Sequence, residues 1–111
     1  MKYKILEKEF TKSGWMFKQI KRVGDYAIYS KQHKDHKTCS MEVIKISRHQ
    51  GYEIAGNKIE PAEVYPSNEQ WGVLGFSPAN LIEAEKKMNW MIKHDQELLK
   101  QKNNRESKTR Q

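Results

Sequence analysis

Residues 15–31 read WMFKQIKRVGDYAIYSK, two runs of mixed apolar and polar residues that meet at Gly24-Asp25. Glycine accepts the positive φ that the first position of a type II′ turn requires, and two-residue turns of this kind join antiparallel strands. Side chains alternate between the faces of a strand, so residues 26, 28 and 30 share one face and residues 27, 29 and 31 the other. We therefore predict a β-hairpin in which neither face is purely polar.

Further strands follow the hairpin. Residues 40–48 (SMEVIKISR) are rich in β-branched side chains, and residues 51–61 (GYEIAGNKIEP) offer a second turn at Gly56-Asn57. The polar stretch 32–39 (QHKDHKTC) predicts a connecting loop. We also expect a first strand at Tyr3 to Lys8, and a short strand near residues 71–76.

The apolar period changes in the last third of the chain. One helical stripe is formed by Leu81, Ala84, Met88, Met91 and Leu98, with Asp95 interrupting it. Two starts are open: Ser77 as N-cap with Pro78 in the first turn, or Asn80 as N-cap with Glu83 three residues later. The sequence therefore predicts one C-terminal helix.

These elements define a fold class and a domain organisation. The chain has 111 residues, about one domain, and is poor in leucine but carries three Trp, five Tyr and five Met. We predict an α+β fold, a small antiparallel sheet of three to five strands packed by one C-terminal α-helix. Residues 1–101 form the single domain, and the basic residues 102–111, which include no apolar side chain, are expected to be disordered.

The lack of a recognisable targeting signal and the single cysteine bear on the cellular compartment. No apolar run approaches the roughly 18 residues of a membrane-spanning helix, and the N-terminus lacks the apolar core of a signal peptide. Cys39 is the only cysteine, so no internal disulfide can form. We expect a protein of the cytoplasm, monomeric or homodimeric.

Charge is unevenly placed along the chain. The net charge is +7 over residues 1–58, −5 over residues 59–85 and +5 over residues 86–111. Such a chain could meet phosphate on one face and a protein on another, although ordinary solvated faces would give the same pattern.

Metal binding and catalysis have little support in the sequence. Four side chains that can bind a transition metal fall within seven residues: His33, Asp35, His36 and Cys39. Their spacing matches no established finger, so we predict a solvated loop, no metal and no cofactor. The chain has no GxSxG, Gly-rich phosphate loop, HExxH or DxD motif, and we predict that it is not an enzyme. A small nuclease with dispersed carboxylates remains an alternative.

Nucleic-acid binding has more support. Aromatic residues interleave with basic ones in the hairpin region, a pattern suited to stacking on single-stranded bases. The candidate nucleic-acid-binding residues are Trp15, Lys18, Lys21, Arg22 and Lys31. The alternative is that the aromatic residues build the core while the basic residues solvate the outer face.

Residues 63–80 (EVYPSNEQWGVLGFSPAN) contain no Lys or Arg. Together with GYEIAG upstream, the overlapping stretch IEPAEVYPSNEQWG and LIEAEKKM downstream, this sequence resembles small bacteriophage and mobile-element proteins of unassigned function over about residues 41–88. The resemblance implies a phage-encoded inhibitor of a host defence nucleoprotein, similar to anti-CRISPR proteins. Its partner would be a host ribonucleoprotein or its guide RNA. The candidate protein-binding residues are Glu63, Tyr65, Glu69 and Trp71.

Two other interpretations stay open. Residues 63–80 could form a connection that closes the fold, with Trp71 packed on the helix. The whole protein could instead be an autonomous single-stranded RNA- or DNA-binding protein.

Overall fold

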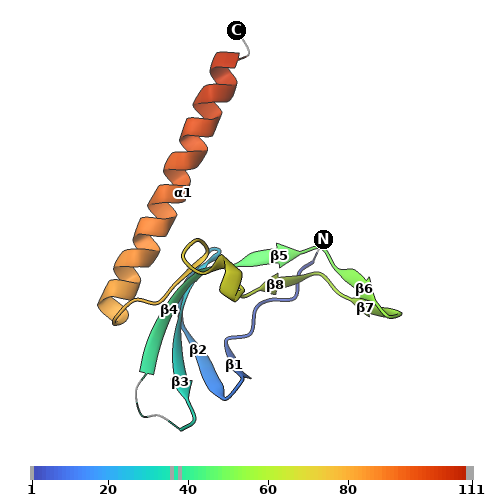
Figure 1. Cartoon of the computed structure of the whole chain (residues 1–111). Coiled ribbons are helices and arrows are strands. Elements are labelled where there is room, and N and C mark those ends of the chain that lie inside the picture. Colours follow the sequence, from blue (N-terminus) through green and yellow to red (C-terminus); the bar gives the residue numbers. More distant parts are fainter. Residues whose placement is uncertain (1, 36, 38, 110–111) are drawn as a thin grey trace.

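The computed structural model describes residues 2–35, 37 and 39–109, with side chains as far as residue 103 in the C-terminal helix. The fold is α+β, as predicted, with one C-terminal helix packed on a five-stranded antiparallel sheet (Figure 1). The elements in chain order are β1 (Glu9–Lys12), β2 (Trp15–Val23), β3 (Tyr26–His33), β4 (Cys39–Lys45), β5 (Ser47–His49), β6 (Tyr52–Ile54), β7 (Asn57–Ile59), β8 (Ala62–Val64), a 3₁₀ turn η1 (Asn68–Gln70), β9 (Gly75–Phe76) and α1 (Leu81–Thr109).

The main sheet has the strand order β1-β2-β3-β4-β9, and the predicted hairpin is its centre. Gly24 has φ +61 while Asp25 keeps a negative φ, as a type II′ turn requires. The register pairs Val23 with Tyr26 and continues to Trp15 opposite His33. An irregularity between residues 19 and 21 leaves Ile20 without a partner on β3.

The helix covers one face of the sheet over β3 and β4. Ala84, Met88 and Met91 are buried against Ile28 and Val43. Asn80 is the N-cap, because its side chain accepts a hydrogen bond from the Glu83 backbone N–H at 2.9 Å. The second of the two predicted helix starts is therefore confirmed.

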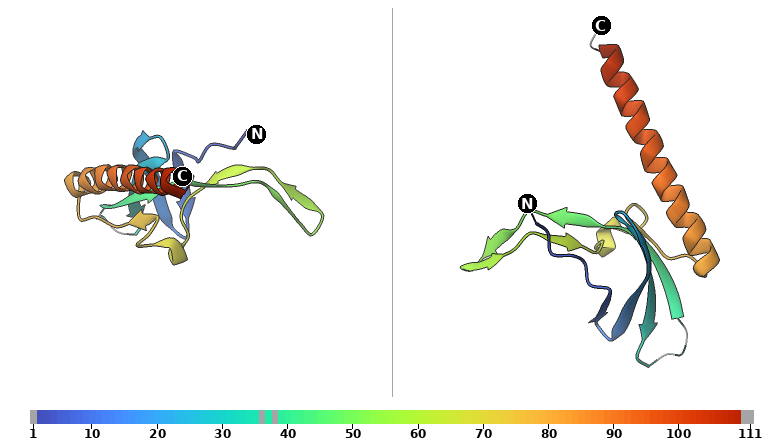
Figure 2. Two further views of the ribbon diagram at one scale, coloured as in Figure 1. Left: turned by 90° about the horizontal axis from the view of Figure 1, so that it is seen from above. Right: turned by 180° about the vertical axis from the view of Figure 1, so that it is seen from behind.

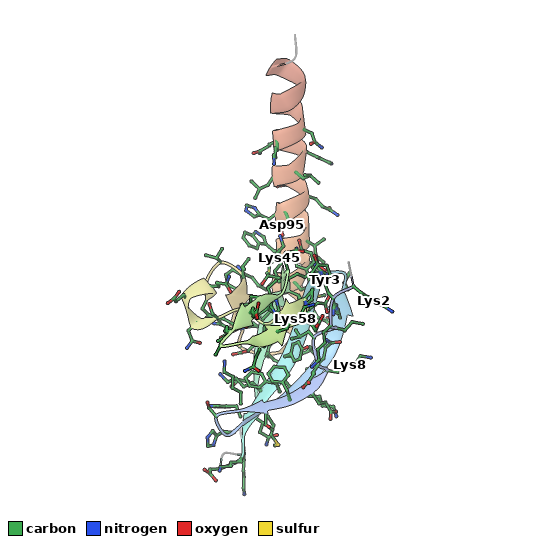
Figure 3. The ribbon with its side chains drawn as sticks, turned by 90° about the vertical axis from the view of Figure 1, so that its right-hand side faces the viewer. Lys2, Tyr3, Lys8, Lys45, Lys58 and Asp95 are labelled. Atoms are coloured by element: carbon green, nitrogen blue, oxygen red, sulfur yellow. The ribbon has the colours of Figure 1, made fainter. Side chains whose placement is uncertain are left out.

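Asp95 does not interrupt the helix packing but fastens the helix to the sheet. Its carboxylate accepts hydrogen bonds from the Tyr26 hydroxyl and from Lys45 Nζ, the latter at 2.9 Å. Figure 3 shows Asp95 directly above Lys45, at the height where the helix leaves the sheet. Burial opposes ionisation of Asp95, but these two partners outweigh it and lower the pKa of the carboxyl.

The opposite face of the sheet holds a second, aromatic core. Phe17, Ala27, Tyr29 and Ile44 are buried there, and partly buried rings pack against them. Phe10 stacks on Phe17 with ring centroids 4.7 Å apart. The alternation predicted for residues 26–31 therefore supplies two cores, one on each face.

Strands β5 to β8 form an arm that leaves the sheet. β5 pairs with β8, and the β6–β7 hairpin continues outward, away from the helix (Figure 2). The turn of this hairpin lies at Ala55-Gly56 rather than at the predicted Gly56-Asn57, since Asn57 already belongs to β7. Both turn residues have positive φ, which the geometry of a type I′ turn demands, even though alanine rarely adopts it.

Two expectations about element bounds were wrong. Residues 3–8 hold a single bridge, Lys4 to Ala62, and the first strand of the sheet begins at Glu9. In place of a strand over 71–76, a tight turn follows η1 and β9 covers two residues. The helix is assigned as far as Thr109, beyond residue 101, where the domain was predicted to end.

Candidate functional site

A groove of about 500 Å³ opens on the face of the sheet opposite the helix. We call it the aromatic groove and define it by six side chains from four parts of the chain: Trp15 and Phe17 on β2, Lys31 on β3, Glu42 on β4, and Tyr65 and Trp71 in the segment between β8 and β9. The strand residues share a face because each strand alternates, whereas the last two arrive from a segment that crosses over this face. Four of the six, the tryptophan and phenylalanine of β2, the lysine and the glutamate, lie on strands of the sheet.

A carboxylate lies at the floor of the groove. Glu42 is 7% exposed. Its Oε1 accepts a hydrogen bond from the Tyr65 hydroxyl at 2.6 Å, and its Oε2 lies 3.4 Å from Lys31 Nζ. Burial, reinforced by the neighbouring Glu42, raises the pKa of the Tyr65 phenol far above its ordinary value. Tyr65 is therefore a neutral donor, and the carboxylate faces one hydroxyl and one ammonium.

Lys31 also contacts the groove walls. Its Nζ lies 4.6 Å from the centroid of the Trp15 ring and 5.6 Å from that of Phe17, within the range of cation–π contacts. The ammonium is thus held between aromatic faces and the Glu42 carboxylate. A lysine in this setting is positioned more tightly than one on an open strand.

Trp71 closes the other side of the groove. Its indole N–H donates to Ser77 Oγ at 3.0 Å, and its ring covers Gly75 so closely that a Cβ there would overlap it. A capping box formed by Ser67 and Gln70 fixes the 3₁₀ turn that precedes it. Trp71 packs on the aromatic core and not on the helix, which corrects the expectation that a fold-closing Trp71 would contact the helix.

The predicted nucleic-acid-binding residues are divided among three places. Trp15 and Lys31 lie in the aromatic groove. Lys18 and Lys21 are exposed on the face that the helix partly covers, where their strand partners are Ser30 and Ile28. They cannot act on the same surface as the groove residues, because the sheet lies between them.

The remaining candidate of that set, Arg22, is part of an internal ion-pair cluster. Its guanidinium forms a bidentate pair with Glu63, with N–O distances of 2.8 and 2.7 Å. Arg48 joins two carboxylates, because its Nη2 donates to Glu63 Oε2 at 3.0 Å and also to Asp25 Oδ1. The Leu6 backbone N–H donates to the same carboxylate at 2.9 Å. Arg22 is therefore committed to a structural contact.

Glu63 is the centre of this ion-pair cluster, and it is not on a contact surface. Its side chain is 6% exposed. The hydrogen bonds from Arg22 lower its pKa to about 2, and they outweigh the opposing effect of burial. The sequence placed Arg22 and Glu63 in two different candidate sites, and the structure joins them in one.

The other predicted protein-binding residues are also separated. Tyr65 and Trp71 belong to the aromatic groove, and Glu69 lies exposed in η1 beside it. Sequence reasoning missed Glu42. The alternation of β4 places it among buried neighbours, and a carboxylate at such a position was the signal that could have found it.

The polar segment from the end of β3 to the start of β4 holds the four candidate metal ligands of the sequence analysis, of which three belong to the described residues. Among the described residues, no group of three His, Cys, Asp or Glu side chains lies close enough to hold an ion. His33 packs edge-on against Trp15 at 4.8 Å and its Nδ1 accepts a hydrogen bond from the Asp35 backbone N–H. Cys39 is exposed, and His36 lies outside the described residues.

Apolar side chains are also exposed outside the groove. Met16, Ile20 and Val23 lie on the part of β2 that the helix leaves open. Others lie on the arm and along the outer half of the helix: Tyr52, Ile54, Ile59, Leu98 and Leu99. Within residues 2–35, 37 and 39–109, no helix is long and apolar enough to cross a membrane.

Comparison with known proteins adds no assignment to this geometry: no family model, no curated protein and no solved structure matches the chain.

Proposed function

We propose that this is a non-enzymatic binding protein of the bacterial cytoplasm that attaches to a host defence ribonucleoprotein and inhibits it, as the resemblance to phage and mobile-element proteins implies. The observation that supports this proposal most strongly is the shape. The radius of gyration is 16.9 Å, against about 13 Å for a compact domain of this length. The chain is less compact because two elements, the arm (β5 to β8) and the outer half of the helix, project from a small core.

Both projections carry apolar side chains that nothing in the described chain covers. On the arm, Tyr52 is 50% and Ile54 59% exposed, and on the helix Leu98 is 50% and Leu99 60% exposed. Figures 1 and 2 show the two projections pointing away from the sheet in different directions. Apolar side chains held away from the core are typical of surfaces that bind another macromolecule. Two separated contacts suit a large partner better than a small one.

Charge supports a partner that contains nucleic acid. The helix carries lysines along its described length, and the N-terminal segment adds Lys2 and Lys8, which Figure 3 shows pointing away from the body of the protein. Basic side chains on the outer surfaces favour contact with phosphate. The acidic Glu69, which is exposed beside the groove, would face a basic surface on the protein part of the partner.

The non-enzymatic part of the proposal rests on how the least exposed carboxylates are used. Glu63 is neutralised by two arginines, Asp95 is tied to Lys45, and Glu42 accepts from Tyr65. Each has a structural partner. A general base, in contrast, needs a carboxylate that is free to take a proton from a substrate.

The test is affinity capture of the tagged protein from a bacterial lysate, with and without RNase. We expect a stoichiometric ribonucleoprotein whose protein subunits survive RNase. The double variant Ile54→Asp with Ile59→Asp should lose capture and keep its circular dichroism, because the outer hairpin pairs only within itself among the described strands. Val73→Asp, at another exposed apolar side chain, is the matched control. Recovery of mixed RNA alone would contradict the proposal.

A second candidate function is autonomous binding of single-stranded nucleic acid. The aromatic groove favours it, because two residues chosen for nucleic-acid binding, Trp15 and Lys31, share that groove with Tyr65 and Trp71. Aromatic faces beside an ammonium are what base stacking next to a phosphate chain requires. This function predicts salt-sensitive binding to bare oligonucleotides.

A further inference from the structure

The floor of the aromatic groove offers an acceptor and a donor side by side. A carboxylate can accept about four hydrogen bonds, and Glu42 accepts one from Tyr65 and one long one, 3.4 Å, from Lys31. An ammonium has three donors, and Lys31 directs one of them at this carboxylate. Both groups line the groove, so each has hydrogen-bonding capacity left for a ligand.

The walls fit a flat ring. Trp15, Tyr65 and Trp71 line a space of about 500 Å³, which lies within the usual range of small-ligand sites, about 300–1,000 Å³. Aromatic side chains stack on nucleobases because every base presents a π-face. The site therefore combines a stacking surface with a polar floor.

From this combination we propose that the aromatic groove binds a nucleobase and prefers guanine. The Watson–Crick edge of guanine presents O6 as an acceptor, followed by the N1–H and N2–H donors. Lys31 would donate to O6, and Glu42 would accept from N1–H and N2–H together, a two-point contact to a charged acceptor. Adenine and cytosine offer the carboxylate one amino group, and uracil offers it one ring N–H, so each makes one contact fewer.

A cationic ligand fits the groove less well. Aromatic groups around a carboxylate often bind ammonium ions, but here the ammonium of Lys31 already lies over Trp15 and next to Glu42. A second cation would have to displace that side chain or accept its repulsion. A neutral ring with both donors and acceptors uses both groups as they stand.

Guanine could come from a free nucleotide or from a single-stranded nucleic acid. Lys12 and Asn68 at the rim of the groove could contact a phosphate or a sugar in either case. The proposal rests on the second candidate function and sharpens it. Nucleic acid that bound without regard to base would keep that function and overturn the guanine site.

The experiment is calorimetric titration of the intact protein with GMP, AMP, CMP and UMP, and with single-stranded hexamers that differ in one central base. We expect GMP to bind about tenfold more tightly than the other three nucleotides, because guanine makes one more hydrogen bond to a charged acceptor. A guanine hexamer that binds much more tightly than GMP, and weakens with salt, would identify a nucleic acid as the source. If the guanine hexamer and GMP bind with equal affinity, the ligand is a free guanine nucleotide.

Two variants test the roles of the groove residues, and a third is the control. Glu42→Gln should abolish the preference for guanine, and Trp71→Leu should weaken binding of every base about tenfold. Trp90→Leu is the control, because Trp90 is exposed on the helix, away from the groove.

If a groove variant fails to fold, nuclear magnetic resonance of the wild type decides in its place. GMP should shift the indole N–H signals of Trp15 and Trp71 and leave that of Trp90 unmoved. Absence of nucleotide binding, equal binding of all four bases, or shifts confined to Trp90 would each overturn the proposal.

Discussion

Replacing Glu63 with glutamine should cost this protein much of its stability. Glu63→Gln keeps the size of the side chain, removes the charge that Arg22 and Arg48 surround, and replaces one acceptor oxygen with an NH₂ donor. Both arginines would remain, and Arg22, with 23% of its side chain exposed, would lose the opposite charge that offsets its desolvation. Removal of one partner from a pair this enclosed is strongly destabilising, because the other charge is left uncompensated.

The magnitude follows from the pKa. The carboxyl of Glu63 falls from an ordinary value of 4.5 to about 2 in the folded protein. At about 1.4 kcal/mol per unit of pKa, this difference corresponds to about 3.5 kcal/mol of folding free energy at neutral pH. For a domain of this size such a loss lowers the melting temperature by about 10–20 °C.

The dependence on pH has a definite sign. Because folding lowers the pKa of Glu63, its contribution is complete above about pH 4.5 and disappears as the pH falls toward 2. Wild type and Glu63→Gln should therefore differ most at pH 7 and converge in acid.

The assay is thermal and urea unfolding followed by circular dichroism at several pH values between 7 and 2.5. Glu69→Gln is the matched control, since Glu69 is exposed and joins no ion pair among the described residues. It should change stability by less than about 0.5 kcal/mol. If Glu63→Gln melts within a few degrees of the wild type at pH 7, the assignment of Glu63 to a structural cluster is refuted.

Three further substitutions probe other parts of the fold, the first two by the same unfolding assay and the third by hydrogen exchange. Gly75→Ala should destabilise by about 1–3 kcal/mol, because its Cβ would displace the Trp71 ring, and Trp fluorescence should change with it. Asn80→Ala should cost about 1 kcal/mol, because the Glu83 N–H loses its cap; no loss would refute that cap. Asp95→Asn should increase hydrogen exchange of the helix before that of the sheet, because it removes the ion pair joining them; equal effects would refute this role.

Local patterns predicted the fold where they were strong. The Gly24-Asp25 turn and the alternation around it specify the central hairpin, and the stripe of Ala84, Met88 and Met91 specifies the helix face. The stripe through Leu98 also predicted most of the helix length, whereas its end at Thr109 lies past residue 101, where the apolar pattern stops. The second hairpin turn was misplaced by one residue because alanine at positive φ is unfavourable and rarely expected.

The candidate site was predicted in its parts and not in its arrangement. Trp15, Lys31, Tyr65 and Trp71 were all chosen from sequence, but as two sites, since nothing local shows that β2, β3 and the segment before β9 meet on one face. The pairing of Arg22 with Glu63 spans 41 residues, and such long-range contacts leave no local pattern.

The most direct test of the proposed inhibition is a plasmid-interference assay in the bacterium whose defence complex the capture experiment returns. Cells with a guide that targets the plasmid are transformed with and without expression of this protein, and cells with a non-targeting guide provide the reference. We predict that the protein restores transformation of the targeted plasmid to the reference level, and that the variant with Ile54→Asp and Ile59→Asp does not. Unchanged interference at full expression of the folded protein would contradict it.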